Sequence, residues 1–333
     1  MTRSEYAIEA EGLVKRYGET RALDGVDLAV PPGRLLGVLG PNGAGKTTAV
    51  RILATLLAPD GGRASVLGFD VRERAHQVRS LIGLTGQYAA VDEMLTGVEN
   101  LVMIGRLLGL SRRESRQRAV SLLERFDLAD AGGRAAKTYS GGMRRRLDLA
   151  ASLVGRPQVL FLDEPTTGLD PRGRIEVWEA VRRLAAEGTT VLLTTHYLDE
   201  ADKLSDRIAV IDRGRTVIED TPAGLKRAIG GDRIEVVVTD PADLPAAAKL
   251  LAEVSNGAEP QVDSDELRVH APATDRVHAV AEVARRVQEA GIDVQDLGLR
   301  RPTLDEVFLQ LTGHQADPNT SPSATATQEG ART

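Results

Sequence analysis

A glycine-rich stretch, "GPNGAGKTT" at residues 40–48, carries the clearest chemical signal in the sequence. Its spacing fits G-x-x-x-x-G-K-[ST], a pattern in which backbone N–H groups and a lysine surround a phosphate chain. Lys46 would reach the β- and γ-oxygens, and Thr47 would ligate Mg²⁺. An ordinary glycine-rich turn before a helix is the weaker interpretation, because an apolar run precedes the stretch and a helix-forming run follows it. The expected cofactor-binding residues are Gly40, Pro41, Asn42, Gly43, Ala44, Gly45, Lys46, Thr47 and Thr48.

Two adjacent carboxylates end a second apolar run, "VLFLDEP" at residues 159–165. Asp163 could hold a metal ion, and Glu164 could orient and deprotonate a water that attacks a phosphate. By themselves the two carboxylates could equally cap the next turn, but the phosphate loop upstream favours the catalytic interpretation. His196 ends a third apolar run, where it could hydrogen-bond a γ-phosphate, although a lone histidine is more often structural.

Three further features are weaker. Gln87 could contact metal and water, and Tyr17 could stack on adenine, but each alone is more often ordinary surface. In "YSGGM" at residues 139–143, Ser140, Gly141 and Gly142 look like a phosphate cradle before a helix, yet no lysine follows.

The elements that must position these residues alternate between strand and helix. Buried strands are expected at residues 34–40, 158–165, 189–196 and 206–214, with a helix at 174–188. This alternation predicts a mainly parallel α/β sheet. Residues 92–137 are amphipathic and predict a helical insertion, with a capping box at Ser111 and Glu114 opening one helix.

The pattern of expected strands and helices changes after about residue 230. Strands are expected at residues 232–240, 266–272 and 292–300, and helices at 275–291 and 303–313, the last capped by Thr303 with Glu306 and ended by Gly313. We therefore expect a nucleotide-binding domain at 1–230 with a helical subdomain at about 88–140. A small α+β domain at 231–313, regulatory or dimerising, and a disordered tail at 314–333 would follow.

The bulk composition excludes several classes of function. The 333 residues include no cysteine, which excludes disulfides and thiolate metal sites. The net charge of -6 argues against nucleic acid as the main partner. No stretch approaches the roughly 18 apolar residues of a membrane span, so we expect no direct membrane insertion and a membrane role only through a partner.

Over residues 7–230 the set resembles the ATP-binding subunits of ABC transporters. The resemblance implies a P-loop NTPase core with a helical subdomain and identifies the 40–48 loop as the phosphate loop that binds ATP. It implies that Glu164, His196, Gln87 and Lys46 are catalytic, and that Thr47, Gln87 and Asp163 hold Mg²⁺. Tyr17 resembles the adenine-stacking aromatic, and residues 168–170 resemble the loop that crosses between subunits.

"YSGGM" is similar to the family signature LSGGQ, with Tyr139 in place of leucine and Met143 in place of glutamine. The resemblance implies that Ser140, Gly141 and Gly142 touch the γ-phosphate of an ATP held by a second copy of the chain, giving a homodimer closed by ATP. The three arginines that follow, residues 144–146, are interpreted as a solvated helix face rather than as a phosphate-binding group.

The stretches at residues 84–110 and 301–313 resemble the antibiotic-export branch of actinobacteria. That branch implies an ABC-2-type permease as partner, a peripheral position on the cytoplasmic side of the cell membrane, and efflux of an anthracycline-like drug or antibiotic. Export of a lipid or glycan, a soluble ABC ATPase in translation or DNA repair, and a phosphate-loop kinase outside the family are the alternatives.

Overall fold

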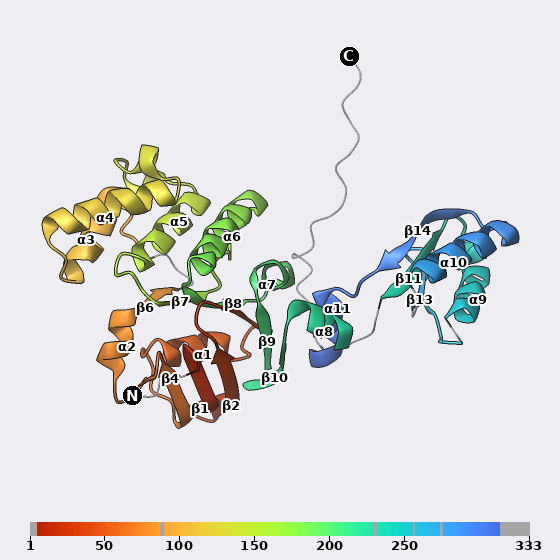
Figure 1. Ribbon diagram of the computed structural model, residues 1–333, viewed down its shortest axis with the longest axis horizontal. Coiled ribbons are helices and arrows are strands. Elements are labelled where there is room, and N and C mark those ends of the chain that lie inside the picture. The colour runs from red at the N-terminus through yellow and green to blue at the C-terminus, as the bar shows by residue number, and fades with distance from the viewer. Residues whose placement is uncertain (1–4, 87–89, 229–231, 256, 274–275, 314–333) are drawn as a thin grey trace, which may run out of the picture. The chain divides into compact units, whose positions relative to one another are not determined.

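The computed structural model describes residues 5–86, 90–228, 232–255, 257–273 and 276–313 (Figure 1). The chain forms two compact units, one ending at Glu219 and one beginning at Asp220, and each is described here by itself. The sequence placed the boundary near residue 230, so helix α8 (Pro222–Ala228) belongs to the second unit rather than the first. The expected disordered tail at 314–333 lies outside the described residues.

A six-stranded sheet forms the centre of the first unit, and its four pairings among β9, β3, β8, β7 and β6 are parallel. In spatial order the strands are β10 (Arg215–Asp220), β9 (Arg207–Asp212), β3 (Leu35–Leu39), β8 (Thr190–Thr195), β7 (Val159–Asp163) and β6 (Ile82–Thr85). The helices between them are α1 (Lys46–Leu53), α2 (Ala75–Leu81), α6 (Pro171–Ala186) and α7 (Leu198–Leu204). The predicted parallel sheet is confirmed. Helix α6 begins earlier than expected, because Asp170 caps it and Pro171 suits the first helical position.

Both faces of this sheet are buried, which explains why its strands are continuous apolar runs. Leu36, Val38 and Phe161 pack into one core with α1, while Leu35 and Leu160 face a second core that α5 and α6 cover. The carboxyl ends of β3, β7 and β8 are thereby fixed side by side, which is where Gly40, Glu164 and His196 follow.

A second, antiparallel sheet in the first unit was not expected from the sequence. Its order is β2-β1-β4-β5, and its strands are β1 (Ile8–Tyr17), β2 (Thr20–Val30), β4 (Gly61–Val66) and β5 (Phe69–Asp70). The pairing register of β1 shifts between Ala10 and Leu13, and Gly12 there has φ of 58°. Such a bulge interrupts the two-residue alternation by which a strand is recognised in sequence.

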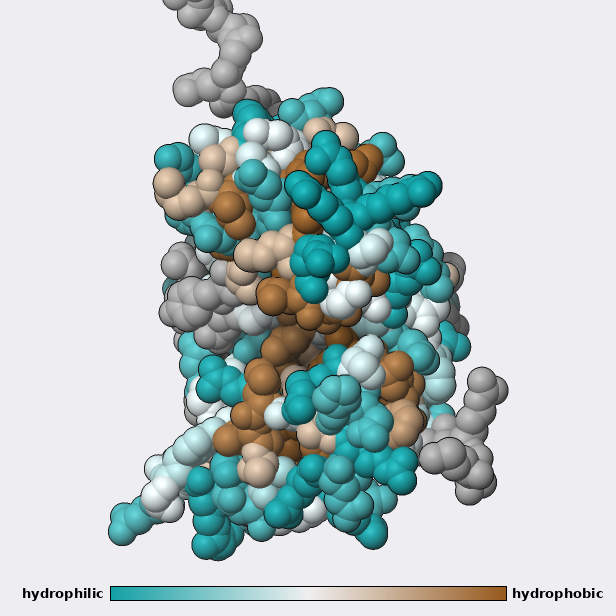
Figure 2. Space-filling model, turned by 90° about the vertical axis from the view of Figure 1, so that its left-hand side faces the viewer, coloured by the Kyte–Doolittle hydropathy of each residue, from teal (hydrophilic) through white to brown (hydrophobic). Residues whose placement is uncertain are grey.

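The predicted helical insertion is confirmed. It comprises α3 (Gly97–Leu107), α4 (Arg112–Arg125), two 3₁₀ turns (Ala129–Ala131 and Ala136–Thr138) and α5 (Gly141–Ser152). Ser111 and Glu114 form the expected reciprocal capping box. Figure 2 views the first unit from the side of α2, α3 and α4, where hydrophobic side chains gather in a band. The large exposed hydrophobic residues of the insertion are Met94, Met103, Leu107, Leu108 and Val120.

The second unit is an antiparallel sheet of order β12-β13-β11-β14 with its own core. Its elements are α8, β11 (Arg233–Val238), a 3₁₀ turn (Pro241–Asp243), α9 (Leu244–Val254), β12 (Gln261–Asp263), β13 (Arg268–Pro272), α10 (Arg276–Ala290), β14 (Val294–Arg300) and α11 (Leu304–Thr312). Alternate residues of β11 are buried, as expected for a sheet covered on one face. Thr303 caps α11 and Gly313 ends it, as predicted.

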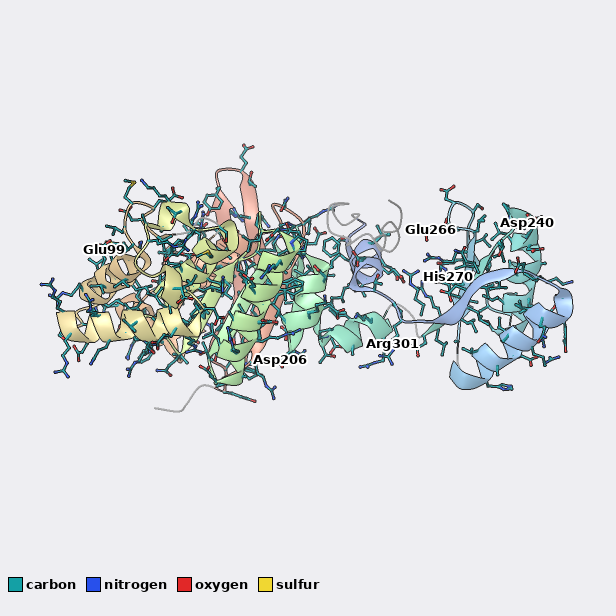
Figure 3. All side chains as sticks on the ribbon, turned by 90° about the horizontal axis from the view of Figure 1, so that it is seen from above. Glu99, Asp206, Asp240, Glu266, His270 and Arg301 are labelled. Carbon is teal, nitrogen blue, oxygen red and sulfur yellow. The ribbon has the colours of Figure 1, made fainter. Side chains whose placement is uncertain are left out.

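Charged side chains of neighbouring strands pair with one another in the second unit. Glu235 on β11 lies 3.4 Å from Arg268 on β13 and 3.0 Å from Arg300 on β14. His270, labelled in Figure 3, lies 3.2 Å from Arg233. Across the described ranges of both units, no helix is long and apolar enough to cross a bilayer.

Candidate active site

The loop between β3 and α1 depends on its glycines. Gly45 precedes α1 with φ of 109°, and a Cβ there would lie 2.5 Å from the carbonyl oxygen of Ala22. A Cβ on Gly40 would lie 2.2 Å from the carbonyl oxygen of Ile211. Only glycine fits both positions. The loop therefore holds the first N–H groups of α1 open toward a pocket, where an anion would be favoured.

Lys46 lies at the base of this loop and is 4% exposed. Its Nζ donates to the carbonyl oxygens of Gly40, at 2.7 Å, and Pro41, at 3.1 Å, and lies 3.6 Å from Oε1 of Glu164. Burial lowers the pKa of Lys46, and the Glu164 carboxylate opposes that shift. An anion in the pocket would stabilise the ammonium form of Lys46 further, in agreement with the phosphate-binding role that the 40–48 motif predicts.

Thr47 and Asp163 lie close enough to share one ligand. The Thr47 hydroxyl donates to Oδ1 of Asp163 at 3.0 Å, and the Thr194 hydroxyl donates to the same oxygen at 2.7 Å. A hydroxyl and a carboxylate oxygen are hard donors of the kind that Mg²⁺ takes, together with phosphate oxygens and water. The residues present therefore fit Mg²⁺, which Thr47 and Asp163 would hold.

Glu164 has an unusual backbone conformation at the end of β7. Its φ is 50°, in the left-handed region that non-glycine residues rarely adopt. Its N–H donates to the Thr194 hydroxyl at 3.1 Å, and Oε2 accepts from the Thr167 hydroxyl at 3.3 Å. Strained backbone of this kind persists where the surroundings over-determine it, which is common at active sites.

The charges around Glu164 keep it ionised. His196 Nδ1 lies 3.3 Å from Oε2, although it is not aligned for a hydrogen bond. The interaction with His196 is the largest influence that lowers the pKa of Glu164; Lys46 acts in the same direction, and burial opposes both. An ionised carboxylate beside a phosphate pocket can accept a proton from water.

These side chains surround a pocket of about 420 Å³. It is lined by Ala22, Asn42, Gly43, Ala44, Gly45, Lys46, Thr47, Thr48 and Glu164. The structure thus brings together the predicted phosphate loop, Asp163, Glu164 and His196. Tyr17, at the end of β1, is 48% exposed and does not line the pocket as described. Gln87 lies outside the described residues.

Ser140, Gly141 and Gly142 line a second pocket, of about 500 Å³. Its other walls come from α5, from the loop at residues 168–170 and from the start of α6. Within the described part of the chain, this pocket shares no lining residue with the first. The turn at residues 140–142 therefore does not complete the phosphate site of its own chain.

The two departures from the signature have structural reasons. Tyr139 is buried and its hydroxyl donates to the carbonyl oxygen of Ala131 at 2.8 Å. Met143 packs against the core of the insertion and lines the second pocket, while its N–H donates to the Ser140 side chain that caps α5. Tyr139 thus supports the turn from inside, and Met143 replaces a polar group at its edge.

The expectation of a solvated arginine face at residues 144–146 is wrong for Arg145. Its side chain is 6% exposed and contacts the backbone of Glu164 and Pro165, directly after β7. Arg146 is also mostly covered and pairs with Glu176 at 3.3 Å, whereas Arg144 pairs with Glu93 nearer the surface. Periodicity failed here because three consecutive arginines cannot all lie on one helix face.

Sequence reasoning also missed Thr194, Thr167 and Glu200. Glu200 is fully buried and accepts from Trp178 Nε1 and the Thr166 hydroxyl, at 2.8 and 2.9 Å. Burial raises the pKa of Glu200, so the neutral form of this carboxyl group is favoured. The hydroxyls in the apolar run "TTVLLTTH" were a usable signal, since buried polar groups require partners.

The parallel sheet, the phosphate loop and the carboxylate pair define a phosphate-loop ATPase. Known proteins agree: residues 23–167 match the model of the ABC transporter family, and residues 221–312 match that of the DrrA1-3-like C-terminal domain of ATP-binding proteins. The chain belongs to the ABC transporter family, among the daunorubicin/doxorubicin resistance ATP-binding proteins. It is an ATPase that binds ATP and couples its hydrolysis to transport.

The similar proteins match nearly the whole chain. A daunorubicin resistance ATP-binding protein, DrrA2, of Streptomyces coeruleorubidus is 64% identical over 94% of this chain and 97% of that protein. The daunorubicin/doxorubicin resistance ATP-binding protein DrrA of Streptomyces peucetius is 53% identical over 97% of each. A Nod factor export ATP-binding protein I of Ralstonia nicotianae is 39% identical over 92% of this chain and 94% of that protein.

Solved structures match the first unit. The structure of cbiO1 from Clostridium perfringens, part of an ABC transporter complex, has a TM-score of 0.63 at 27% identity and covers 68% of this chain and 94% of that one. An ATP-binding cassette of an ABC transporter in its ADP conformation has a TM-score of 0.59 at 29% identity, over 65% of this chain and 91% of that one.

Proposed function

We propose that this ATPase drives efflux of an anthracycline-like drug or antibiotic through a separate ABC-2-type permease. Two chains form a homodimer that ATP closes, attached peripherally to the cytoplasmic side of the cell membrane. The observation that carries the ATPase mechanism is the convergence of Lys46, Thr47, Asp163, Glu164 and His196 on one edge of the sheet.

In this mechanism Lys46 binds the β- and γ-phosphates. Thr47 and Asp163 would hold Mg²⁺, which would supply charge neutralisation at the phosphate oxygens, and Gln87 would be a further ligand of the metal and water. Glu164, whose neighbours lower its pKa, orients the attacking water and accepts its proton. His196 holds Glu164 and contacts the γ-phosphate, and Tyr17, half exposed, stacks on the adenine.

The second pocket shares no described lining residue with the first, and this supports the proposal that two chains form a dimer. Ser140 and Gly141 are exposed at the start of α5, and with the buried Gly142 they line a pocket that lacks a lysine among its described lining residues. A second copy of the chain supplies that lysine from its own phosphate loop. ATP is then the ligand that joins one chain's Lys46 to the other's Ser140.

The cargo rests on similarity, not on the site. Relatives that are 64% and 53% identical over 94% and 97% of the chain bear names of daunorubicin and doxorubicin resistance. The exposed hydrophobic residues of the insertion offer a surface for the permease (Figure 2). A lipid or glycan cargo is the second candidate, because Nod factor export proteins are also similar over most of the chain.

Glu164→Gln tests the catalytic assignment. The amide keeps the shape but cannot accept the proton, so we expect phosphate release to fall about 10²- to 10⁴-fold. Binding of a fluorescent ATP analogue should persist, and the variant should accumulate as an ATP-bound dimer in size-exclusion chromatography. Glu93→Gln, the same kind of substitution at an exposed ion pair with Arg144, is the matched control. Near-normal phosphate release by Glu164→Gln would disprove the assignment.

The cargo and the partner are tested together in cells that lack this gene and the neighbouring permease gene. Restoring both wild-type genes should lower accumulation of fluorescent anthracyclines, and restoring the permease with Glu164→Gln should not. Unchanged accumulation of every anthracycline tested would favour the lipid or glycan cargo. An ATPase that stays in the soluble fraction when the permease is present would support a soluble role instead.

The second unit is proposed to steady or regulate the ATPase dimer. Its independent core and the matching C-terminal domain model support a separate role. Deleting residues 220–333 should weaken ATP-dependent dimerisation measured by analytical ultracentrifugation. Unchanged assembly would remove the dimerisation part of this proposal.

A further inference from the structure

Arg145 contacts the backbone around the proposed catalytic residue through a fork of hydrogen bonds. From the first turns of α5, its Nε donates to the carbonyl oxygen of Pro165 at 2.6 Å. Its Nη2 lies 3.4 Å from the carbonyl oxygen of Glu164. A planar guanidinium can direct several donors at once, which an ammonium cannot. One side chain thus holds two successive carbonyls at the end of β7.

Asp148 extends this contact to a third part of the first unit. It is 3% exposed, and Oδ2 lies 3.2 Å from Arg145 Nη1. Burial raises the pKa of Asp148, and the charge of Arg145 opposes that rise. Asp148 Oδ1 accepts from the N–H of Ala90 at 2.8 Å, and Arg145 Nη1 donates to the carbonyl oxygen of Gly86 at 2.7 Å.

The contact falls where the backbone needs support. Glu164, with φ of 50°, is held by Thr194 on its N–H side and by Arg145 on its carbonyl side. A non-glycine residue in this conformation is strained and persists where its surroundings hold it in place. Stability alone is a weak reason for a buried ion pair, because apolar residues of similar volume are often as stable.

We propose that Arg145 and Asp148 act as a positioning pair, which holds Glu164 in its left-handed conformation and joins it to the helix that begins at Ser140. This rests on the proposed function, in which Glu164 is the base and Ser140 meets the partner's ATP. The pair connects α5 to the catalytic carboxylate of the same chain and to the backbone at Gly86 and Ala90. A movement of α5 when the dimer closes is thereby transmitted to Glu164.

Arg145→Lys tests the pair in the full-length chain. Lysine keeps the positive charge beside Asp148 but cannot reach the carbonyls of Gly86, Glu164 and Pro165 together. We expect kcat for ATP hydrolysis to fall about tenfold to a hundredfold, because small misplacement of a catalytic group has effects of this size. The dissociation constant for a fluorescent ATP analogue should change by less than about twofold, since Lys46 and its loop are untouched.

Two further variants separate positioning from folding. Asp148→Asn keeps an oxygen for the N–H of Ala90 but removes the charge that orients Arg145, so we expect a smaller fall in kcat and unchanged ATP binding. Glu93→Gln removes the surface ion pair with Arg144 but leaves the hydrogen bond from Arg144 to the carbonyl oxygen of Tyr139, and it should leave kcat within about twofold of wild type. Activities are expressed per ATP-binding site, so partial misfolding does not lower them.

Each outcome decides the inference. A lower kcat in Arg145→Lys and Asp148→Asn, with ATP binding and melting temperature retained, supports it. A kcat equal to that of Glu93→Gln overturns it, and so does a joint loss of kcat, ATP binding and melting temperature, which would indicate a purely structural pair. Glu164→Gln keeps the two proposals apart: if that variant still hydrolyses ATP, the base assignment fails whatever the Arg145 variants do.

Discussion

Two glycine-containing turns each precede a helix in the first unit, and the pockets beside them differ in how complete they are. The turn before α1 encloses Lys46 at 4% exposure and closes over a pocket with Glu164. The turn before α5 contributes only Ser140, Gly141 and Gly142 to its pocket, with Arg146 and Arg172 as the cations in the described lining. The first turn is a nearly complete phosphate site, whereas the second is one wall of a site.

The glycines of the two turns also serve different purposes. At Gly45 the backbone is left-handed and a Cβ would meet the carbonyl oxygen of Ala22 at 2.5 Å. At Gly142 a Cβ would have ordinary contacts, 3.4 Å from Cα of Gly173 and 3.7 Å from Oε2 of Glu176. The first turn therefore needs its glycine in order to fold, whereas the second, where Gly142 is buried, has room for a Cβ.

The largest expected effect comes from mixing two inactive variants. Lys46→Ala damages the first turn and Ser140→Arg the second, and each alone should lower ATP hydrolysis by about 10²- to 10³-fold. A mixed dimer contains one doubly damaged site and one intact site, so the mixture should recover phosphate release that neither variant shows alone.

Mixing each variant with more of itself at the same total concentration is the control. Should the two-variant mixture remain as inactive as its components, the second turn does not serve a partner's ATP.

A matched pair of alanine substitutions separates the two glycines. Gly45→Ala should lower the free energy of unfolding by about 1–3 kcal/mol, through backbone strain and overlap. Gly142→Ala should destabilise less than Gly45→Ala, because its Cβ would have ordinary contacts, while still lowering ATP hydrolysis because a methyl group enters the second pocket. Urea denaturation and phosphate release check both, and equal destabilisation by the two variants would contradict the comparison.

His196→Ala should change the pH dependence of the first site. Glu164 acts as a base only when ionised, and the interaction with His196 is the largest influence that lowers its pKa. Without the ring the pKa of Glu164 rises, so the acid limb of the kcat profile should move to higher pH. Tyr197→Phe, which keeps the ring beside His196, is the control. An acid limb that does not move would show that His196 does not set the pKa of Glu164.

The smallest expected effect concerns Glu200, which accepts a hydrogen bond from Trp178 of α6. Burial raises the pKa of Glu200 in the folded state, so the folded protein keeps this proton at pH values where the unfolded chain has lost it. The free energy of unfolding should therefore fall as pH rises above the usual carboxyl range.

Glu200→Gln cannot titrate and should flatten that dependence. Urea denaturation can be followed by the fluorescence of Trp178, the one tryptophan of the sequence, which donates to Glu200. Parallel pH curves for the wild type and Glu200→Gln would contradict the expectation.

Much of the fold follows from local pattern. The parallel strands are apolar runs because helices and a second sheet cover both faces, and Ser111, Asp170 and Thr303 mark helix starts by cap chemistry. The antiparallel sheet at the start of the first unit was missed, because the bulge at Gly12 breaks its alternation. The unit boundary was placed too late, because it depends on long-range contacts rather than composition.

The sequence by itself determined the chemistry of the nucleotide site, because Gly45, Lys46 and Thr47 are fixed by spacing in one loop and Asp163 and Glu164 by the end of one apolar strand. Only the tertiary structure decided which groups act together across the chain. In the folded chain the Thr194 hydroxyl donates to Asp163, and Ser140 lines a different pocket from the phosphate loop. Arg145 is buried against the carbonyl oxygen of Glu164. These contacts join residues far apart in sequence, and local pattern carries no information about which buried polar group will satisfy which.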